Sequence, residues 1–247
     1  MPDKQEGTQT VTAVGYVFNT PVVVKARTWL PITQLGVGVI MTWLAGRKHP
    51  DWPYWKRVAT GTFSMTAILG SEWCHNLAHA AAASLIGKPM DALRVIWGMP
   101  RVIYHDINDE RVAPRQHIFR ALGGPLLNAS LFALALGIKR FTQPDSAARE
   151  IADAAVGMNA FLCSVSLLPI PGIDGGPILK WSLVERGHTP QAADEVVKNV
   201  NGVLGCVLGT AAGVELRKRH WFAGGLLGLL SASSLLIGFG IIREQVP

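Results

Sequence analysis

Six long stretches of this chain carry almost no charge. A transmembrane helix needs about 20 consecutive, mostly apolar residues, and only Glu72 interrupts the six stretches. A soluble all-α protein with buried helices rarely contains so many of them. They therefore predict an all-α polytopic membrane protein with about six transmembrane helices. The stretches are Thr28–Gly46, Val58–Gly87, Ala121–Ile138, Ala154–Ile173, Asn199–Val214 and Trp221–Ile242.

The composition agrees with a bilayer environment. Charged residues make up 16% of the 247 residues and apolar residues 49%, which excludes a disordered chain. The net charge of +6 comes from scattered side chains without long basic runs, so we expect the lipid bilayer as a partner and no nucleic acid. The three cysteines lie in apolar stretches and are an odd number, which argues against a disulfide framework. They are Cys74, Cys163 and Cys206.

The stretches suggest three regions along the chain. Residues 1–27 form a polar segment whose Val- and Thr-rich part, Val11–Lys25, predicts short strands. Residues 28–180 form the membrane core, and residues 181–247 hold a further helix and the last two transmembrane helices.

Two local signals lie in the connections. Between the second and third stretches, Leu93–Trp97 and Arg101–Tyr104 predict a small β-hairpin joined by Gly98-Met99-Pro100. Thr189-Pro190 predicts the start of a helix, with the threonine as cap and the proline in the first turn.

The second stretch contains a cluster of polar side chains. Glu72, His75 and His79 follow a helical spacing that places them on one face, with Asn76 at its edge. Two histidines at positions i and i+4 are suited to binding one metal ion, although they can also form ordinary hydrogen bonds inside a helix bundle. The other histidines lie in connections and are expected to be solvated or interfacial: His49, His105, His117, His188 and His220.

A carboxylate follows the fourth stretch. Asp174 comes after Pro169 and Pro171 and before Gly175-Gly176, in a sequence that ends a helix and turns tightly. Counted as helix, the residues from Ala154 to Asp174 bring this carboxylate to about the same depth as the two histidines. Two histidines and one carboxylate form a catalytic zinc arrangement.

With these motifs the sequence resembles the site-2 protease family of intramembrane zinc metalloproteases, over about residues 15 to 180. His75–His79 occupies the place of the family's H-E-x-x-H motif, and Gly123–Asn128 is similar to its G-P-x-x-N turn. Leu167–Gly176 is similar to the motif that supplies its aspartate, and the hairpin also has a counterpart.

The resemblance implies zinc held by His75, His79 and Asp174, and a substrate that is a membrane-protein helix. It implies that Asn128 and Ser166 bind substrate, and that the hairpin side is cytosolic. We accordingly expect an integral, multi-pass protein of a prokaryotic cell membrane.

Two positions depart from the family pattern. Asn76 replaces the glutamate that serves as general base, and an amide cannot accept a proton at neutral pH. Ser166 replaces the asparagine that opens the second motif. Glu72 could substitute as the base, become a further metal ligand, or accept a hydrogen bond from His75. It could also be a protonated glutamic acid that is hydrogen-bonded within the helix bundle.

Three hypotheses follow from the sequence. The first is an intramembrane zinc protease with altered base chemistry, in which the hairpin pairs with the unwound substrate. The second is a pseudoprotease that binds membrane helices without cutting them, which Asn76 and Ser166 favour. The third is an unrelated cation transporter, which the lack of an internal repeat disfavours.

Overall fold

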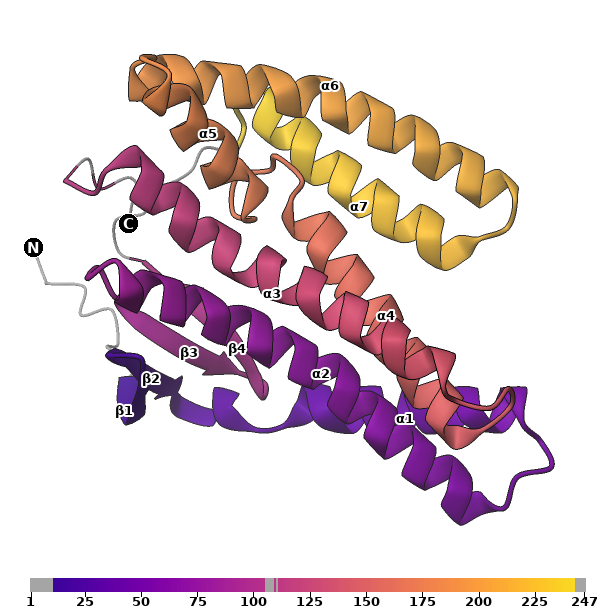
Figure 1. The fold of residues 1–247 in the computed structure, drawn as a ribbon. Helices are drawn as coiled ribbons and strands as arrows, with labels where there is room; N and C mark the ends of the chain where they lie inside the picture. The colour runs from indigo at the N-terminus through magenta and orange to yellow at the C-terminus, as the bar shows by residue number, and fades with distance from the viewer. Residues whose placement is uncertain (1–10, 105–108, 110, 243–247) are drawn as a thin grey trace, which may run out of the picture. The chain divides into compact units, whose positions relative to one another are not determined.

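The computed structural model describes residues 11–104, 109 and 111–242, and over these it is mostly helical (Figure 1). Each of the six uncharged stretches lies largely within a long helix, as predicted. A shorter seventh helix, α5, follows the fourth stretch. The helices are α1 (Ile32–Lys48), α2 (Tyr54–Leu85), α3 (Pro114–Arg140), α4 (Ala147–Ser166), α5 (Gly175–Glu185), α6 (Pro190–Arg217) and α7 (Trp221–Gly238).

The chain divides into two compact units. The first comprises Met1–His105 with Gly123–Val165, and the second comprises Asp106–Leu122 with Ser166–Pro247. The first unit therefore contains α1, α2, α4 and most of α3, and the second contains α5, α6 and α7. The predicted boundaries after residues 27 and 180 stay predictions. They separate consecutive regions of the sequence, whereas each compact unit combines two separate segments.

A four-stranded sheet belongs to the first unit, so the expectation of an all-α fold with only a hairpin was incomplete. The strands β1 (Val11–Val17), β2 (Thr20–Lys25), β3 (Ala92–Ile96) and β4 (Met99–Ile103) lie in the order β1-β2-β3-β4. The predicted N-terminal strands and the predicted hairpin both form, but β2 pairs with β3 in parallel and joins them. This pairing links segments about 70 residues apart, and local sequence patterns do not specify such a contact.

The hairpin turn is shorter than predicted. Trp97 and Gly98 alone form it, both with positive φ (53° and 83°), as the two-residue turns of tight hairpins require. Pro100 therefore lies inside β4, where it is tolerated because β4 is an edge strand. The Gly98 carbonyl accepts hydrogen bonds from Gln34 on α1 (2.7 Å) and Trp73 on α2 (3.1 Å), which attach the turn to both helices.

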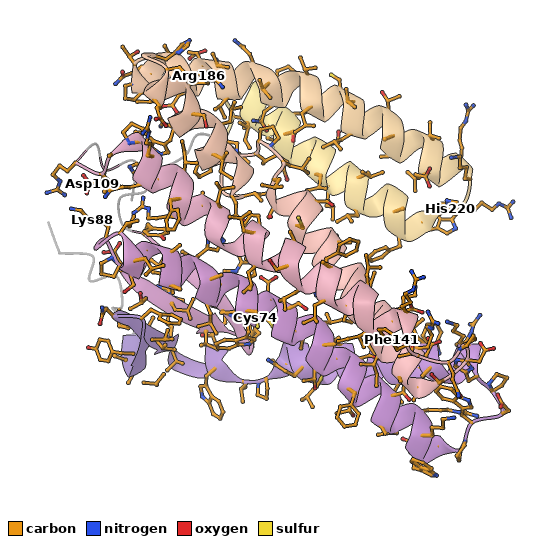
Figure 2. All side chains as sticks on the ribbon, in the orientation of Figure 1. Cys74, Lys88, Asp109, Phe141, Arg186 and His220 are labelled. Carbon is orange, nitrogen blue, oxygen red and sulfur yellow. The ribbon has the colours of Figure 1, made fainter. Side chains whose placement is uncertain are left out.

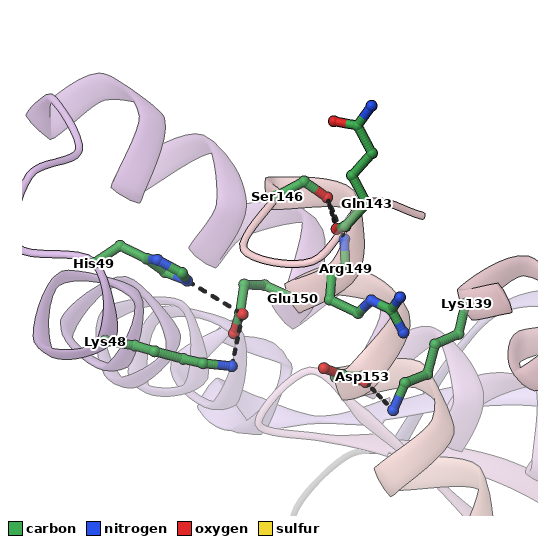
Figure 3. Close-up of polar contacts among 8 residues, drawn as sticks. All are labelled: Lys48, His49, Lys139, Gln143, Ser146, Arg149, Glu150 and Asp153. Atoms are coloured by element: carbon green, nitrogen blue, oxygen red, sulfur yellow. Dashed lines mark hydrogen bonds and ion pairs between the residues drawn. The ribbon is translucent and has the colours of Figure 1, made fainter. Parts of the chain in front are cut away.

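Charged side chains collect where α1 and α3 end and α4 begins (Figure 3). Lys48 and His49 both contact the Glu150 carboxylate, at 2.7 and 3.2 Å, and Lys139 pairs with Asp153 at 2.5 Å. The hydrogen bond to Glu150 raises the pKa of Lys48. These ion pairs place the helix ends at one end of the first unit, outside the uncharged stretches.

In the second unit, α6 and α7 pack closely through small residues. A Cβ atom at Gly238 would lie 2.6 Å from the Cα of Gly202, and the Ser231 hydroxyl donates to the Gly205 carbonyl at 2.7 Å. The predicted start of α6 is confirmed, because the Thr189 hydroxyl accepts a hydrogen bond from the Ala192 amide at 3.2 Å.

Within the part of the chain that the structure describes, two helices, α3 and α7, are long and apolar enough to cross a membrane by length and composition. This supports a membrane protein, while the count of six transmembrane helices stays a prediction. α2 carries Glu72, His75 and His79 along its length, and ionisable side chains of this kind lower the hydropathy of a helix.

Candidate metal centre

The second half of α2 presents two buried histidines to each other. His75 and His79 are one helical turn apart and only 8% and 5% exposed. Their Nε2 atoms lie 3.1 Å apart, with the rings nearly perpendicular. Two nitrogen ligands on one tetrahedral zinc, at about 2.0–2.1 Å from the ion, are themselves about 3.3 Å apart. The two Nε2 atoms are therefore spaced as a pair of zinc ligands would be.

Asn128 on α3 holds the other side of the His75 ring. Its Oδ1 lies 2.5 Å from His75 Nδ1, and the asparagine is fully buried. Metal-ligating histidines usually engage their second nitrogen in such a hydrogen bond, which fixes the orientation of the ring. The Asn128 side chain thus leaves His75 Nε2 directed at His79.

Gly124 allows α3 to approach this pair of rings. A Cβ atom at this position would lie 2.5 Å from His79 Nε2 and 2.6 Å from His75 Nδ1. Any larger residue would displace either the imidazoles or the helix. The close approach of α3 to the two histidines therefore depends on glycine at position 124.

The two residues considered for the base role contact each other. The Asn76 side-chain amide donates to the Glu72 Oε1 at 3.3 Å and to the Glu72 backbone carbonyl at 3.0 Å. Asn76 is buried, whereas Glu72 is partly exposed. The Asn76 NH₂ group therefore orients the Glu72 carboxylate one turn before His75, on the ligand face.

Asp174 and Ser166 belong to the second unit. α4 ends at Ser166, so the depth estimate that counted helix as far as Asp174 was wrong. Pro169 and Pro171 end the helix earlier, and Asp174 occupies the N-cap position of α5. Behind it, a Cβ atom at Gly176 would lie 2.6 Å from the Ile170 carbonyl oxygen, so this turn also depends on glycine.

Sequence reasoning assigned no role to three residues that the structure connects to the histidines directly or through Asn128. Gly124 makes room for them, while Asn159 and Ser71 extend the contacts of Asn128. A signal was present in each case. Gly124 lies within the motif Gly123–Asn128, Asn159 is a polar residue inside an uncharged stretch, and Ser71 lies four residues before His75.

The spacing of the two histidine nitrogens fits a zinc ion. In the comparisons with known proteins, no family model and no curated protein matches the chain. A solved structure does match: the site-2 protease from Methanocaldococcus jannaschii, with a TM-score of 0.52 and 11% identity, over 96% of this chain and 97% of that one. The chain therefore has the fold of a site-2 protease, and the resemblance inferred from the sequence is confirmed.

Proposed function

We propose that this protein is a zinc-dependent intramembrane metalloprotease that cleaves membrane-protein helices. The observation that carries the proposal is the pair of converging Nε2 atoms of His75 and His79, buried and spaced as zinc ligands. The site-2 protease fold supports the same reaction class. It also disfavours the alternative of an unrelated cation transporter.

In this proposal His75, His79 and Asp174 hold the metal. A zinc ion bound by these residues would act as a Lewis acid, which can polarise a carbonyl and lower the pKa of water. Glu72 accepts the proton of the attacking water in place of the family's glutamate. Its carboxylate is held on the ligand face by a hydrogen bond from the Asn76 amide.

The substrate is a transmembrane helix of another protein that unwinds locally. Its extended segment adds to the open edge of β4, where backbone groups pair as in a sheet. Ser166 stays a proposed substrate-binding residue, as the resemblance implies. The contact between Asn128 and His75 favours ligand positioning over substrate binding for this asparagine.

A pseudoprotease is the second candidate, and Asn76 is the observation that favours it. The side chain at this position donates to Glu72 and cannot act as a base. Such a protein keeps the fold and the metal and binds membrane helices without cutting them.

The zinc content of the purified protein in detergent tests the metal site, which the protease and the pseudoprotease candidates share. We expect about one zinc per chain by elemental analysis, as for a single site of this type. His79→Ala and Asp174→Ala should each abolish it, because a tetrahedral site rarely survives the loss of one of three protein ligands. His188→Ala and Asp51→Ala, at exposed positions, serve as controls. Retention of the metal in both ligand variants would show that the ligands are misassigned.

A further inference from the structure

A chain of buried hydrogen bonds starts at His75 and crosses three helices. Asn128 Nδ2 on α3 donates to Asn159 Oδ1 on α4 at 2.7 Å. Asn159 Nδ2 in turn donates to the hydroxyl of Ser71 on α2 at 2.9 Å. Asn159 is only 2% exposed and Asn128 is fully buried. The chain thus returns to α2 one turn before the histidine from which it began.

Two backbone carbonyls fix the direction of every bond in this chain. Asn159 Nδ2 also donates to the Ala155 carbonyl at 2.9 Å, and the Ser71 hydroxyl donates to the Ala67 carbonyl at 2.7 Å. A carbonyl oxygen can only accept. If the Asn159 amide were reversed, its oxygen would face the Ala155 oxygen, and two buried acceptors would oppose each other.

The direction then propagates to the histidine. Because Asn159 presents its oxygen to Asn128, Asn128 must present its NH₂ group to Asn159 and its own oxygen to His75. That oxygen requires a donor, so His75 carries its proton on Nδ1. The neutral ring therefore has its lone pair on Nε2, the nitrogen that faces His79.

We propose that Asn159 is a positioning residue that, through Asn128, holds His75 in the tautomer required for metal binding. The residue lies on a different helix from the ligand and does not contact it. This inference rests on the proposed metal site, since only a metal ligand requires the Nε2 lone pair. It assigns to α4 a function in the site besides packing.

Two substitutions at position 159 distinguish an effect of hydrogen-bond direction on zinc binding from an effect of packing. Asn159→Leu removes the acceptor that orients Asn128 and lets its amide reverse. Asn159→Asp keeps an oxygen facing Asn128 but places a carboxylate in a buried position, where it opposes the Ala155 carbonyl. The aspartate variant should therefore be the less stable of the two, and the leucine variant the weaker zinc binder.

The first measurement is zinc affinity, by competition with a chelator, together with the thermal stability of each variant. We expect affinity close to wild type for Asn159→Asp and at least about tenfold weaker for Asn159→Leu, as for other groups that orient metal ligands. If zinc affinity instead follows stability, with the aspartate variant lowest, or if Asn159→Leu binds as tightly as wild type, the proposal is overturned.

The second measurement reads the tautomer directly in the metal-free protein. In ¹⁵N NMR of histidine-labelled protein, recorded at about pH 8.5, which is well above the ordinary pKa of an imidazole, the His75 signals are those lost in His75→Ala. We expect a protonated Nδ1 in wild type and a shift towards protonated Nε2 in Asn159→Leu. An unchanged His75 signal in this variant would contradict the proposal.

A second pair of variants covers the case in which Asn159→Asp does not fold. Asn128→Asp keeps the acceptor for His75 Nδ1, whereas Asn128→Leu removes it. The aspartate variant should retain zinc binding and the leucine variant should lose it, and equal affinities would overturn the proposal. A wild-type protein that binds no zinc would disprove the proposed function, while the NMR measurement would still decide the role of Asn159.

Discussion

At the residue scale, Asn76 and Glu72 determine which chemistry the ligand face can perform. Asn76 contributes an NH₂ group that donates to the Glu72 carboxylate, so this carboxylate is the candidate base on the ligand face. Replacing this carboxylate by an amide of the same shape removes the base while preserving the hydrogen bond from Asn76. The distinction between an altered protease and a pseudoprotease therefore depends on a single titratable group.

We predict that wild-type protein cleaves a model transmembrane substrate and that Glu72→Gln slows this cleavage by about 10²–10⁴-fold with zinc still bound. Gel analysis of the cleavage products, with elemental analysis of the same sample, provides the measurement. Glu195→Gln, at an exposed position on α6, is the matched control and should leave the rate unchanged. A Glu72→Gln variant that cuts at the wild-type rate would exclude Glu72 as the base.

The position of Asn76 gives the complementary prediction. If wild type binds zinc but does not cut, Asn76→Glu should produce cleavage, because a carboxylate close to the cation stays ionised despite its burial. That result would identify the wild type as a pseudoprotease. If Asn76→Glu also fails to cut with zinc bound, the lack of cleavage is due to weak substrate binding. The next variant to test is then Ser166→Asn.

Two histidines outside the metal centre show where residue-level reasoning failed. His49 and His117 were expected to be solvated or interfacial, yet both are buried. His49 stacks on Trp52 and His117 on Trp181, at ring separations of 3.9 and 3.8 Å. Aromatic rings that cover a histidine in this way are not evident from its position in a connection.

Of the remaining histidines, His188 and His220 are exposed as expected, and Figure 2 shows His220 at the turn between α6 and α7. His105 lies outside the described residues.

At the element scale, the approach of α3 to α2 determines whether the two histidines can hold an ion. Gly124→Ala should abolish zinc binding, because the added Cβ would overlap atoms of both imidazole rings. The rings or α3 would then have to move away from their present positions. Zinc stoichiometry and circular dichroism together test this. Gly137→Ala on the same helix meets no atom within 4 Å, so it should retain the metal and gain slightly in helix stability. Full zinc content in Gly124→Ala would mean that α3 does not constrain the ligands.

At the scale of the whole molecule, the sequence predicted the elements better than their pairing. Uncharged stretches and helix caps such as Thr189 are local signals, and the helices that they predicted are present. The parallel pairing of β2 with β3 depends on segments distant in sequence, and it was missed. In the metal centre, helical spacing sufficed to place His75 beside His79. The role of Asn159 could not be predicted, because it depends on the contact of three helices.

The exposed apolar surface gives the last prediction, which concerns the environment of the molecule. On α1, large apolar side chains remain more than half exposed along successive turns, including Leu35, Val39 and Trp43. Similar side chains are exposed on α3 and α7, the two helices that could cross a membrane. Soluble monomers rarely expose large apolar patches, and contact with lipid acyl chains would cover these side chains.

We therefore predict that the protein is an integral membrane protein and stays in the pellet when membranes are washed with alkaline carbonate. Carbonate opens vesicles and removes proteins held by charge, but it does not extract helices whose apolar faces contact lipid. Immunoblotting of pellet and supernatant measures the distribution, with a soluble protein trapped in the vesicles as the control for release. Recovery of the chain in the supernatant would contradict membrane integration, and with it the proposal of a membrane-embedded substrate, because the exposed faces of α1, α3 and α7 would then need a protein partner instead of lipid.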